Sequence, residues 1–428
     1  MTKRIRLPHS TVWIIPLIYA AVSLTAGLTL PRFELRLWPE MVSRMSVGSA
    51  TAIYSAIASG MIALTGIVFA LIFVMVQFSA TAYSPRLVLL VSRDPVMSHA
   101  LGIFVATFLY PVAAISGIDR DRSGVVPIVS VMIVVGLLTV SVGMFIAIIQ
   151  RIRVLQVSNM LTFTGDQGRA VIDALYPPLG TVSTSGPAPA FRVGLPRQTL
   201  IHRGVPRSIQ ALRMGALVAL AQESGAVIEM MAAVGDMVFE RTPLLRVWGA
   251  GAAIDERKLK HCVEMGAERT FEQDPKYVLR LLVDIAIRAL SPAVNDPTTA
   301  VQALDQIQDL LMRLGMRRLD VGEIRGDDGA VRLVSHNPTW DDFLLLALDE
   351  IRFYGATSVQ VMRRMMALVG DLLSALPPVR HDALRHWHER LAATVVRSFV
   401  DDEEKLLAAM EDRQGLGMPR QRTEGMVH

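Results

Sequence analysis

An uncharged run of the chain, residues 45–85, carries hydroxyl side chains at helix-like intervals and leads to polar and basic residues. Rows of hydroxyls with apolar constrictions are typical of ion permeation paths in membranes. The residues that this pattern predicts to line such a path are Ser55, Ser59, Thr65, Phe69, Gln77 and Arg86. Arg86 and Arg93 would lie at an inner mouth, where their charge would favour anions.

The same run has a second interpretation. Gly48, Ala52, Ala56 and Gly60 recur every four residues, which places them on one stripe of a helix. Small residues in such a stripe let two helices approach closely, and the hydroxyls would then bond back to their own backbone. The two interpretations are compatible, because packing stripes also build oligomers. A conducting path needs an oligomer here, since four helices alone rarely enclose a conduit.

A second polar cluster lies far from this run, in the segment LSPAVNDPTTA. Asp274-Pro275 starts one helix and Ser291-Pro292 ends it. Asp296 then caps the next helix, with Pro297 at its first position. The segment is either a tight corner between helices or a polar elbow that faces a pore mouth or a ligand. The start of the second helix could attract an anion in the latter case. The elbow residues are Ser291, Asn295 and Asp296.

Other reactive side chains form no recognisable site. His381 and His388 are about two turns apart, and His386 lies on another face, so a metal cluster is not expected. The single cysteine, Cys262, excludes an internal disulfide. The sequence has no phosphate-binding loop, nucleophile elbow or HExxH pair. We therefore expect no enzyme activity, no catalytic residues, no metal and no cofactor.

Four apolar runs in the first third of the chain would position the predicted pore residues. The whole sequence is 52% hydrophobic and 19% charged, and the apolar excess is concentrated before Arg151. A membrane-spanning helix needs about 20 apolar residues, and each run is that long. We predict a transmembrane domain of residues 1–153. Its four spans are residues 11–30, 48–80, 96–118 and 124–150.

The charges around the spans predict their orientation. Lysines and arginines near the span ends are more numerous on the side of the termini, which places both termini in the cytoplasm. No Asp, Glu, Lys or Arg lies inside a predicted span, which disfavours an ion-coupled transporter. Only His99, near a span end, could titrate there. Basic residues are not clustered with aromatic residues, so nucleic acid is not an expected partner.

The remaining chain predicts a cytoplasmic α+β region. Residues 154–197 form a connecting helix and linker, and residues 198–250 form a small β-rich module. The stretch AVIEMMAAVGDMVFERTPLLRVW resembles half of a barrel-sandwich (biotinyl- or lipoyl-like) domain, but it has no lysine to carry a cofactor. Residues 251–413 form a helical domain, with residues 381–410 as its last long helix. Residues 414–428 form a flexible tail.

Three segments resemble a family of predicted bacterial membrane proteins, domain of unknown function 2254: QFSATAYSPRLV, LGIFVATFLY and LVDIAIRALSPAVNDPTTA. The resemblance covers nearly the whole chain. It implies a multi-pass bacterial inner-membrane protein and supplies no activity or site residues.

The sequence as a whole predicts a homo-oligomeric ion channel in the lipid bilayer. The second span would line the pore for inorganic ions, and the cytoplasmic region would form a vestibule or gating ring. The alternative is a membrane-anchored scaffold or sensor whose cytoplasmic domain binds a protein partner or a small ligand. Stoichiometry and gating stimulus do not follow from the sequence.

Overall fold

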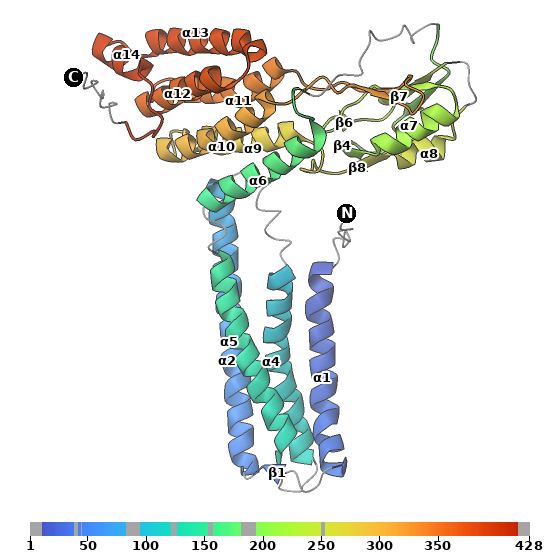
Figure 1. Ribbon diagram of the computed structural model, residues 1–428. Coiled ribbons are helices and arrows are strands. Elements are labelled where there is room, and N and C mark those ends of the chain that lie inside the picture. Colours follow the sequence, from blue (N-terminus) through green and yellow to red (C-terminus); the bar gives the residue numbers. More distant parts are fainter. Residues whose placement is uncertain are drawn as a thin grey trace, which may run out of the picture. The chain divides into compact units, whose positions relative to one another are not determined.

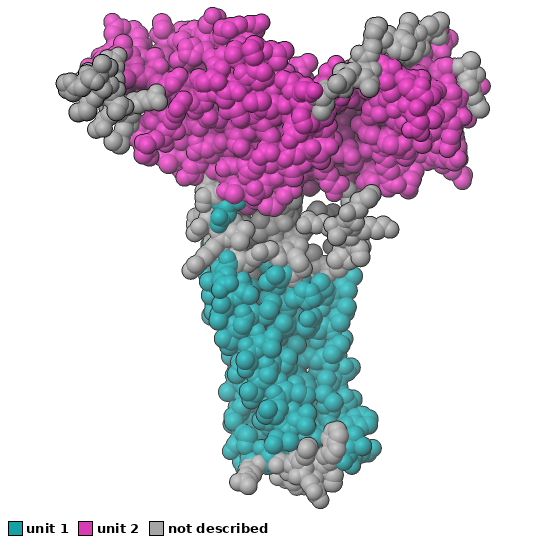
Figure 2. Space-filling view, viewed as in Figure 1, with its two compact units in different colours: residues 1–159 teal, residues 160–428 magenta. Residues whose placement is uncertain are grey.

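The chain folds into two compact units, residues 1–159 and residues 160–428, which Figure 2 shows in different colours. The computed structural model describes residues 11–37, 42–43, 45–82, 95–120, 126–152, 157–180, 194–249 and 253–417. Each unit has apolar clusters of its own, Tyr54 and Tyr110 being central to one cluster of the first unit and Ile228 and Leu245 to one of the second.

Four long helices make up the first unit, and α4 is the central one, because it packs against each of the other three (Figure 1). Their bounds are α1 (Thr11–Leu37), α2 (Val47–Ala82), α4 (Pro95–Arg120) and α5 (Ile128–Ile152). Burial agrees with this arrangement: 56% of the apolar window of α4 is buried, against 22% or less for the other helices.

Each of these helices is long and apolar enough to cross a membrane. The candidate spans are Ile14–Glu34, Val47–Leu71, Val96–Ser116 and Ile128–Gln150. The prediction of four candidate membrane helices at the N-terminus, followed by a region of sheets and helices, is therefore confirmed. Two short strands, β1 (Val42–Ser43) and β2 (Val126–Pro127), pair antiparallel. They join the segments that precede α2 and α5 at one end of the helices.

Most of α6 (Val157–Leu175) belongs to the second unit, which also contains two sheets. The five-stranded sheet has the order β3-β7-β5-β10-β9, and the three-stranded sheet has the order β6-β4-β8. The strands are β3 (Gln198–Ile201), β4 (Arg207–Leu212), β5 (Val227–Met230), β6 (Met237–Val238), β7 (Pro243–Trp248), β8 (Val263–Gly266), β9 (Glu323–Arg325) and β10 (Val331–Val334). Side chains of both sheets share one apolar core with α7 (Met214–Glu223) and α8 (Glu256–His261).

The β module is larger than the predicted residues 198–250. Strand β8 pairs with β4, and β10 pairs in parallel with β5. Strands β8 and β10 both come from the segment 251–413, which we expected to be helical. The pairing of β10 with β5 joins residues about a hundred positions apart, as with Leu333 and Ile228. Local sequence patterns give no information on pairing between strands so far apart. The predicted β module therefore ended too early, at residue 250.

Helices form the rest of the second unit, and α9 and α10 lie at its centre. Asp274 and Asp296 cap these two helices, and a proline follows each cap, as the sequence predicts. The helices are α9 (Pro275–Ala289), α10 (Pro297–Gly315), α11 (Trp340–Tyr354), α12 (Val359–Ala375), the 3₁₀ turn η2 (Pro378–Arg380), α13 (His381–Ser398) and α14 (Asp402–Ala409).

Two predictions at the C-terminal end are wrong. The expected single helix 381–410 is two helices, because Phe399 and Val400 leave the helical conformation and Asp401 caps a new helix by accepting from the Glu403 N–H. Residues 414–417 of the expected flexible tail 414–428 form a hydrogen-bonded turn instead. Residues 418–428 of the tail lie outside the described residues.

Helix α6 is firmly attached to α10 within the second unit. Arg169 donates to Asp309 at 2.6 Å, and Asp173 accepts from Arg313 and Arg317 at 2.9 and 2.5 Å. A Cβ at Gly168 would lie 2.8 Å from Leu310, so glycine permits the close approach of the two helices. The helix that follows the last candidate span is thus part of the C-terminal unit. Our predicted boundary at residue 153 falls in 153–156, outside the described residues.

Candidate functional site

The face of α2 that points away from its own helical unit carries three of the predicted pore residues. The opposite face is buried and consists of Ala50, Tyr54, Ala58, Met61 and Val68. Ser55, Ser59 and Gln77 are exposed. Ser59 follows Ser55 by about one turn, and Gln77 follows Ser59 by 18 residues, or about five turns, so the three share one face. Neither serine hydroxyl makes a hydrogen bond to another described residue.

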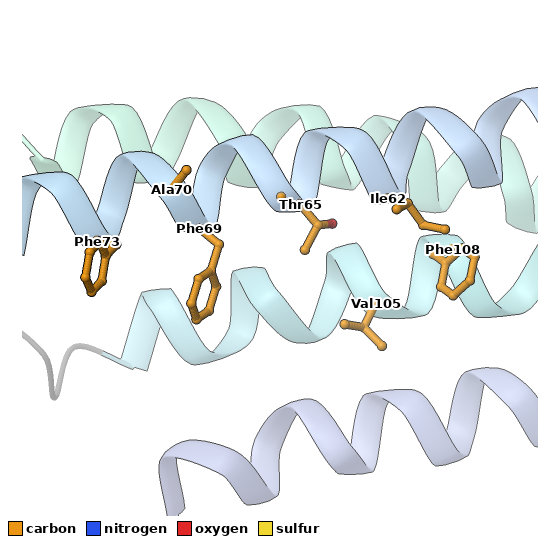
Figure 3. Close-up of a pocket in the computed structure, with 8 residues that line it drawn as sticks. Ile62, Thr65, Phe69, Ala70, Phe73, Val105 and Phe108 are labelled. Atoms are coloured by element: carbon orange, nitrogen blue, oxygen red, sulfur yellow. The ribbon is translucent and has the colours of Figure 1, made fainter.

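Thr65 and Phe69 lie on the flank of α2 rather than on this face. Thr65 is half-buried, and its hydroxyl donates to the Met61 carbonyl at 2.6 Å. Both residues line a groove between α2 and α4, together with Val105 and Phe108 (Figure 3). The structure therefore divides the predicted pore residues into two groups. Arg86, with Arg93, lies outside the described residues.

Other hydroxyls in the first unit are used for packing. Ser23 donates to the Ala106 carbonyl at 2.7 Å and joins α1 to α4. Thr107 and Ser141 join α4 to α5 with a hydroxyl pair at 2.7 Å. Hydroxyls that serve helix association are thus buried and hydrogen-bonded in this protein, in contrast to Ser55 and Ser59. Close to the start of α4, exposed His99 lies 3.2 Å from the Tyr19 hydroxyl.

The glycines of this unit also differ in their surroundings: some pack against another helix of the chain, and those on α2 are exposed. A Cβ at Gly27 or Gly102 would collide with a neighbouring helix, so these glycines permit contacts that the single chain already makes. Gly48, Gly60 and Gly66 on α2 have nothing within 4 Å of a Cβ. The small-residue stripe of α2 therefore has no packing partner among the described residues of one chain.

Glu34 is a buried acid that the sequence analysis missed. The predicted first span ended at residue 30, but α1 continues to Leu37 and Glu34 is 5% exposed. Its two carboxylate oxygens accept from the backbone N–H groups of Val129 and Ser130, at 2.6 and 3.2 Å. These are free donors in the first turn of α5. The expectation that no charged residue lies within a span is corrected, because the candidate span Ile14–Glu34 includes both Arg32 and Glu34.

Replacement of Glu34 by alanine should loosen α5. It removes the acceptor for two N–H groups at a helix start, which costs about 1–2 kcal/mol. Hydrogen exchange of the first turn of α5, measured on the purified protein in detergent, would report the loss as local opening. Arg36→Ala, at an exposed position of the same helix, is the matched control and should change little. Equal protection of the Val129 and Ser130 N–H groups in Glu34→Ala and the wild type would contradict this role.

The polar elbow in the second unit is a self-contained turn. Ser291 Oγ donates to the Arg288 carbonyl at 2.7 Å, and the N–H of Asp296 donates to the Ala289 carbonyl at 2.8 Å. Asp296 accepts from both the backbone N–H and the hydroxyl of Thr299. Asn295 is exposed and has a positive φ of 48°, a conformation that asparagine tolerates. These bonds are those of a tight corner between α9 and α10.

A buried carboxylate lies where α9 meets the β module. Asp274 is 1% exposed, and its Oδ1 accepts from the Tyr277 N–H at 3.1 Å, while Oδ2 has no hydrogen-bond partner. Gly235, with a φ of 92°, faces this carboxylate, and a Cβ there would overlap it. Burial raises the pKa of Asp274, and the positive charges of Lys276 and Arg269 offset only part of that effect.

The stability of this unit should therefore fall as the pH rises through the titration of Asp274. The folded pKa lies above the unfolded value of about 3.9, so the folded state binds more protons between the two values and loses stability as pH increases. Asp274→Asn should remove this dependence and keep the helix cap, whereas Asp274→Ala should lose the cap, about 1 kcal/mol, at every pH. Urea unfolding at several pH values would measure both variants. A wild-type dependence that persists in Asp274→Asn would exclude this carboxylate as its origin.

The described residues contain no group of three or more His, Cys, Asp or Glu side chains that could hold a metal ion. His381 is engaged in a turn, where its Nε2 lies 2.8 Å from the Leu376 carbonyl oxygen. Cys262 is buried, and burial raises the pKa of its thiol.

The four apolar helices and the region of sheets and helices that follows define a helical membrane protein. A family model described as "Predicted membrane protein (DUF2254)" matches residues 9–371, and the chain belongs to this family. It is similar to the uncharacterized proteins Mb1321c of Mycobacterium bovis and Rv1290c of Mycobacterium tuberculosis. Each is 27% identical over 417 residues, covering 93% of this chain and 79% of the relative. No solved structure matches the chain.

Proposed function

We propose that this protein is the subunit of a homo-oligomeric ion channel in the bacterial inner membrane. The observation that carries the proposal is the face of α2 with Ser55, Ser59 and Gln77, which points away from the helical unit of its own chain. In an oligomer, this face would meet the same face of neighbouring copies around a common axis. Its hydroxyl and amide groups would then line a path for inorganic ions.

The remaining parts of the chain have roles in this proposal. If all four candidate spans cross the membrane, the N-terminus and the second unit would lie on the same side, and the Lys and Arg distribution favours the cytoplasm. The second unit would form a vestibule or gating ring. Anions are the favoured ions, because Arg86 would lie near the inner mouth. The proposal involves no enzyme activity, no cofactor and no nucleic acid.

The fold of the β module is a further part of the proposal. Strands β5 and β7 pair in one sheet, and β6, which follows a turn at Gly235, pairs in the other. Two sheets around a common core support a barrel-sandwich-like module. No lysine lies in residues 226–248, so the module would have a structural or binding role.

Reconstitution tests the channel directly. Purified full-length protein in liposomes should carry an ion flux under a voltage, pH or osmotic gradient, and its copy number in detergent should exceed one. Empty liposomes are the control. A monomer, or an oligomer that passes no ion under any of these gradients, would refute the proposal.

The alternative is a membrane-anchored scaffold or sensor, and one feature of the second unit favours it. Large apolar side chains are exposed at the ends of α11 and α13 and in the segment after α13: Phe353, Tyr354, Val396 and Val400. Exposed apolar groups of this kind are common at protein-binding surfaces. Absence of flux together with specific binding of a cytoplasmic protein at these residues would support the alternative.

A further inference from the structure

The exposed surface of α2 changes character along the helix. From Val47 to Gly60 it consists mainly of glycine, alanine and serine, and Ile53 is the large apolar side chain exposed there. Large apolar side chains dominate the following part of the helix. They are Ile62, Ile67, Phe69, Leu71, Phe73 and Val74. Small residues suit contact with another helix, whereas bulky apolar residues suit contact with lipid chains.

The groove between α2 and α4 lies in this bulky part. It has a volume of about 630 Å³, within the range of small-molecule sites, about 300–1,000 Å³. Figure 3 shows the side chains of Phe69 and Phe73 pointing from α2 toward the side of α4, with Val105 and Phe108 contributed by α4. Phe69 is 52% exposed and Phe73 is 64% exposed. The two rings thus form one wall of an open groove.

The chemistry of the groove matches a hydrocarbon. Thr65 supplies the one hydroxyl among its lining side chains, and the Met61 carbonyl already accepts from it. The lining includes no charged side chain. Gly66 leaves space in the groove, since nothing lies within 4 Å of a Cβ there. The only side-chain polar group that lines the groove, the Thr65 hydroxyl, already has a hydrogen bond. An apolar ligand can therefore bind without leaving a buried polar group unpaired.

We propose that this groove binds one acyl chain of a bilayer phospholipid. Its walls lie almost entirely in the candidate spans Val47–Leu71 and Val96–Ser116, so the groove is continuous with the lipid-facing surface of the helices. A helix of a second copy is a poorer occupant. Packed helices are about 8–10 Å apart, and the exposed rings of Phe69 and Phe73 would hold a neighbouring helix away. This inference does not depend on the channel proposal.

A photoreactive phospholipid tests the proposal. Full-length protein is reconstituted with a phospholipid that carries a diazirine in the middle of one acyl chain, irradiated, and mapped by peptide mass spectrometry. Adducts should be enriched on Phe69, Phe73 and Phe108. The reference positions are Val135 and Val140 of α5, which are both 49% exposed on a candidate span. Equal labelling of the groove and the reference positions would overturn the proposal.

Two matched variants sharpen the test. Gly66→Leu fills the groove and should lower its labelling about tenfold, the effect of losing contact with about two methylene groups. Gly143→Leu adds the same side chain at an equally open position of α5 and should leave groove labelling unchanged. Equal effects of the two variants would contradict a bound chain. So would efficient disulfide formation between copies through Phe69→Cys in a Cys262→Ser background, because a second copy would then cover the groove.

Discussion

Ion flux through the reconstituted protein should stop when a charged thiol reagent reacts with a cysteine placed at Ser59. Serine and cysteine are similar in size, so Ser59→Cys should preserve the packing of α2 and conduct before modification. If Ser59 lines an aqueous path, its thiol can ionise and react, and the charged adduct then obstructs the pore. The background is Cys262→Ser, since Cys262 is the one native cysteine. Flux before and after reagent gives the result.

Position 139 on α5 provides the matched control. Thr139 is exposed like Ser59, but it lies among apolar side chains such as Val135 and Val142. A cysteine there would face lipid and should not react with a charged reagent. Ser55→Cys should behave like Ser59→Cys, because the two positions share one face. Unchanged flux after complete modification of Ser59→Cys would show that this face does not line the pore.

Helical periodicity alone could have separated the two groups of predicted pore residues. At about 3.6 residues per turn, Ser55, Ser59 and Gln77 fall on one side of a helix, and Thr65 falls well away from it. The sequence analysis grouped them by residue type instead. It could not establish which side is buried, because α2 is uncharged and carries apolar residues on every side, and its inner face is determined by contact with α4. Tyr54, a polar residue by type, lies on that buried face.

Local signals predicted the spans and the helix starts, and non-local contacts account for what was missed. Length and apolarity are sufficient to identify four membrane helices, and an Asp-Pro pair is sufficient to identify the starts of α9 and α10. The role of Glu34 depends on Val129 and Ser130, about 95 residues away. The sequence around Glu34 contains no sign of that contact. The pairing of β10 with β5 was missed for the same reason.

The ordered C-terminal segment depends on Arg363, and Arg363→Met should release it. Arg363 is 0% exposed, and its guanidinium donates to the carbonyls of Met410 and Gly417, at 3.2 and 2.8 Å. Asp412 completes the turn by accepting from the N–H groups of Gln414, Gly415 and Gly417. Methionine retains much of the side-chain volume but donates no hydrogen bond. We expect a loss of about 3 kcal/mol, which corresponds to two charged hydrogen bonds.

Limited proteolysis and hydrogen exchange of residues 410–417 would measure this release, because both report local opening in a chain of two units, where a single unfolding temperature is not well defined. Arg385→Ala is the control. Arg385 pairs with Asp382 on the surface of α13, where an exposed ion pair contributes little, so exchange in residues 410–417 should not change. If Arg363→Met leaves this segment as protected as in the wild type, then Asp412 and the hydrogen bond that Gln360 donates to the Gly415 carbonyl are sufficient to order it.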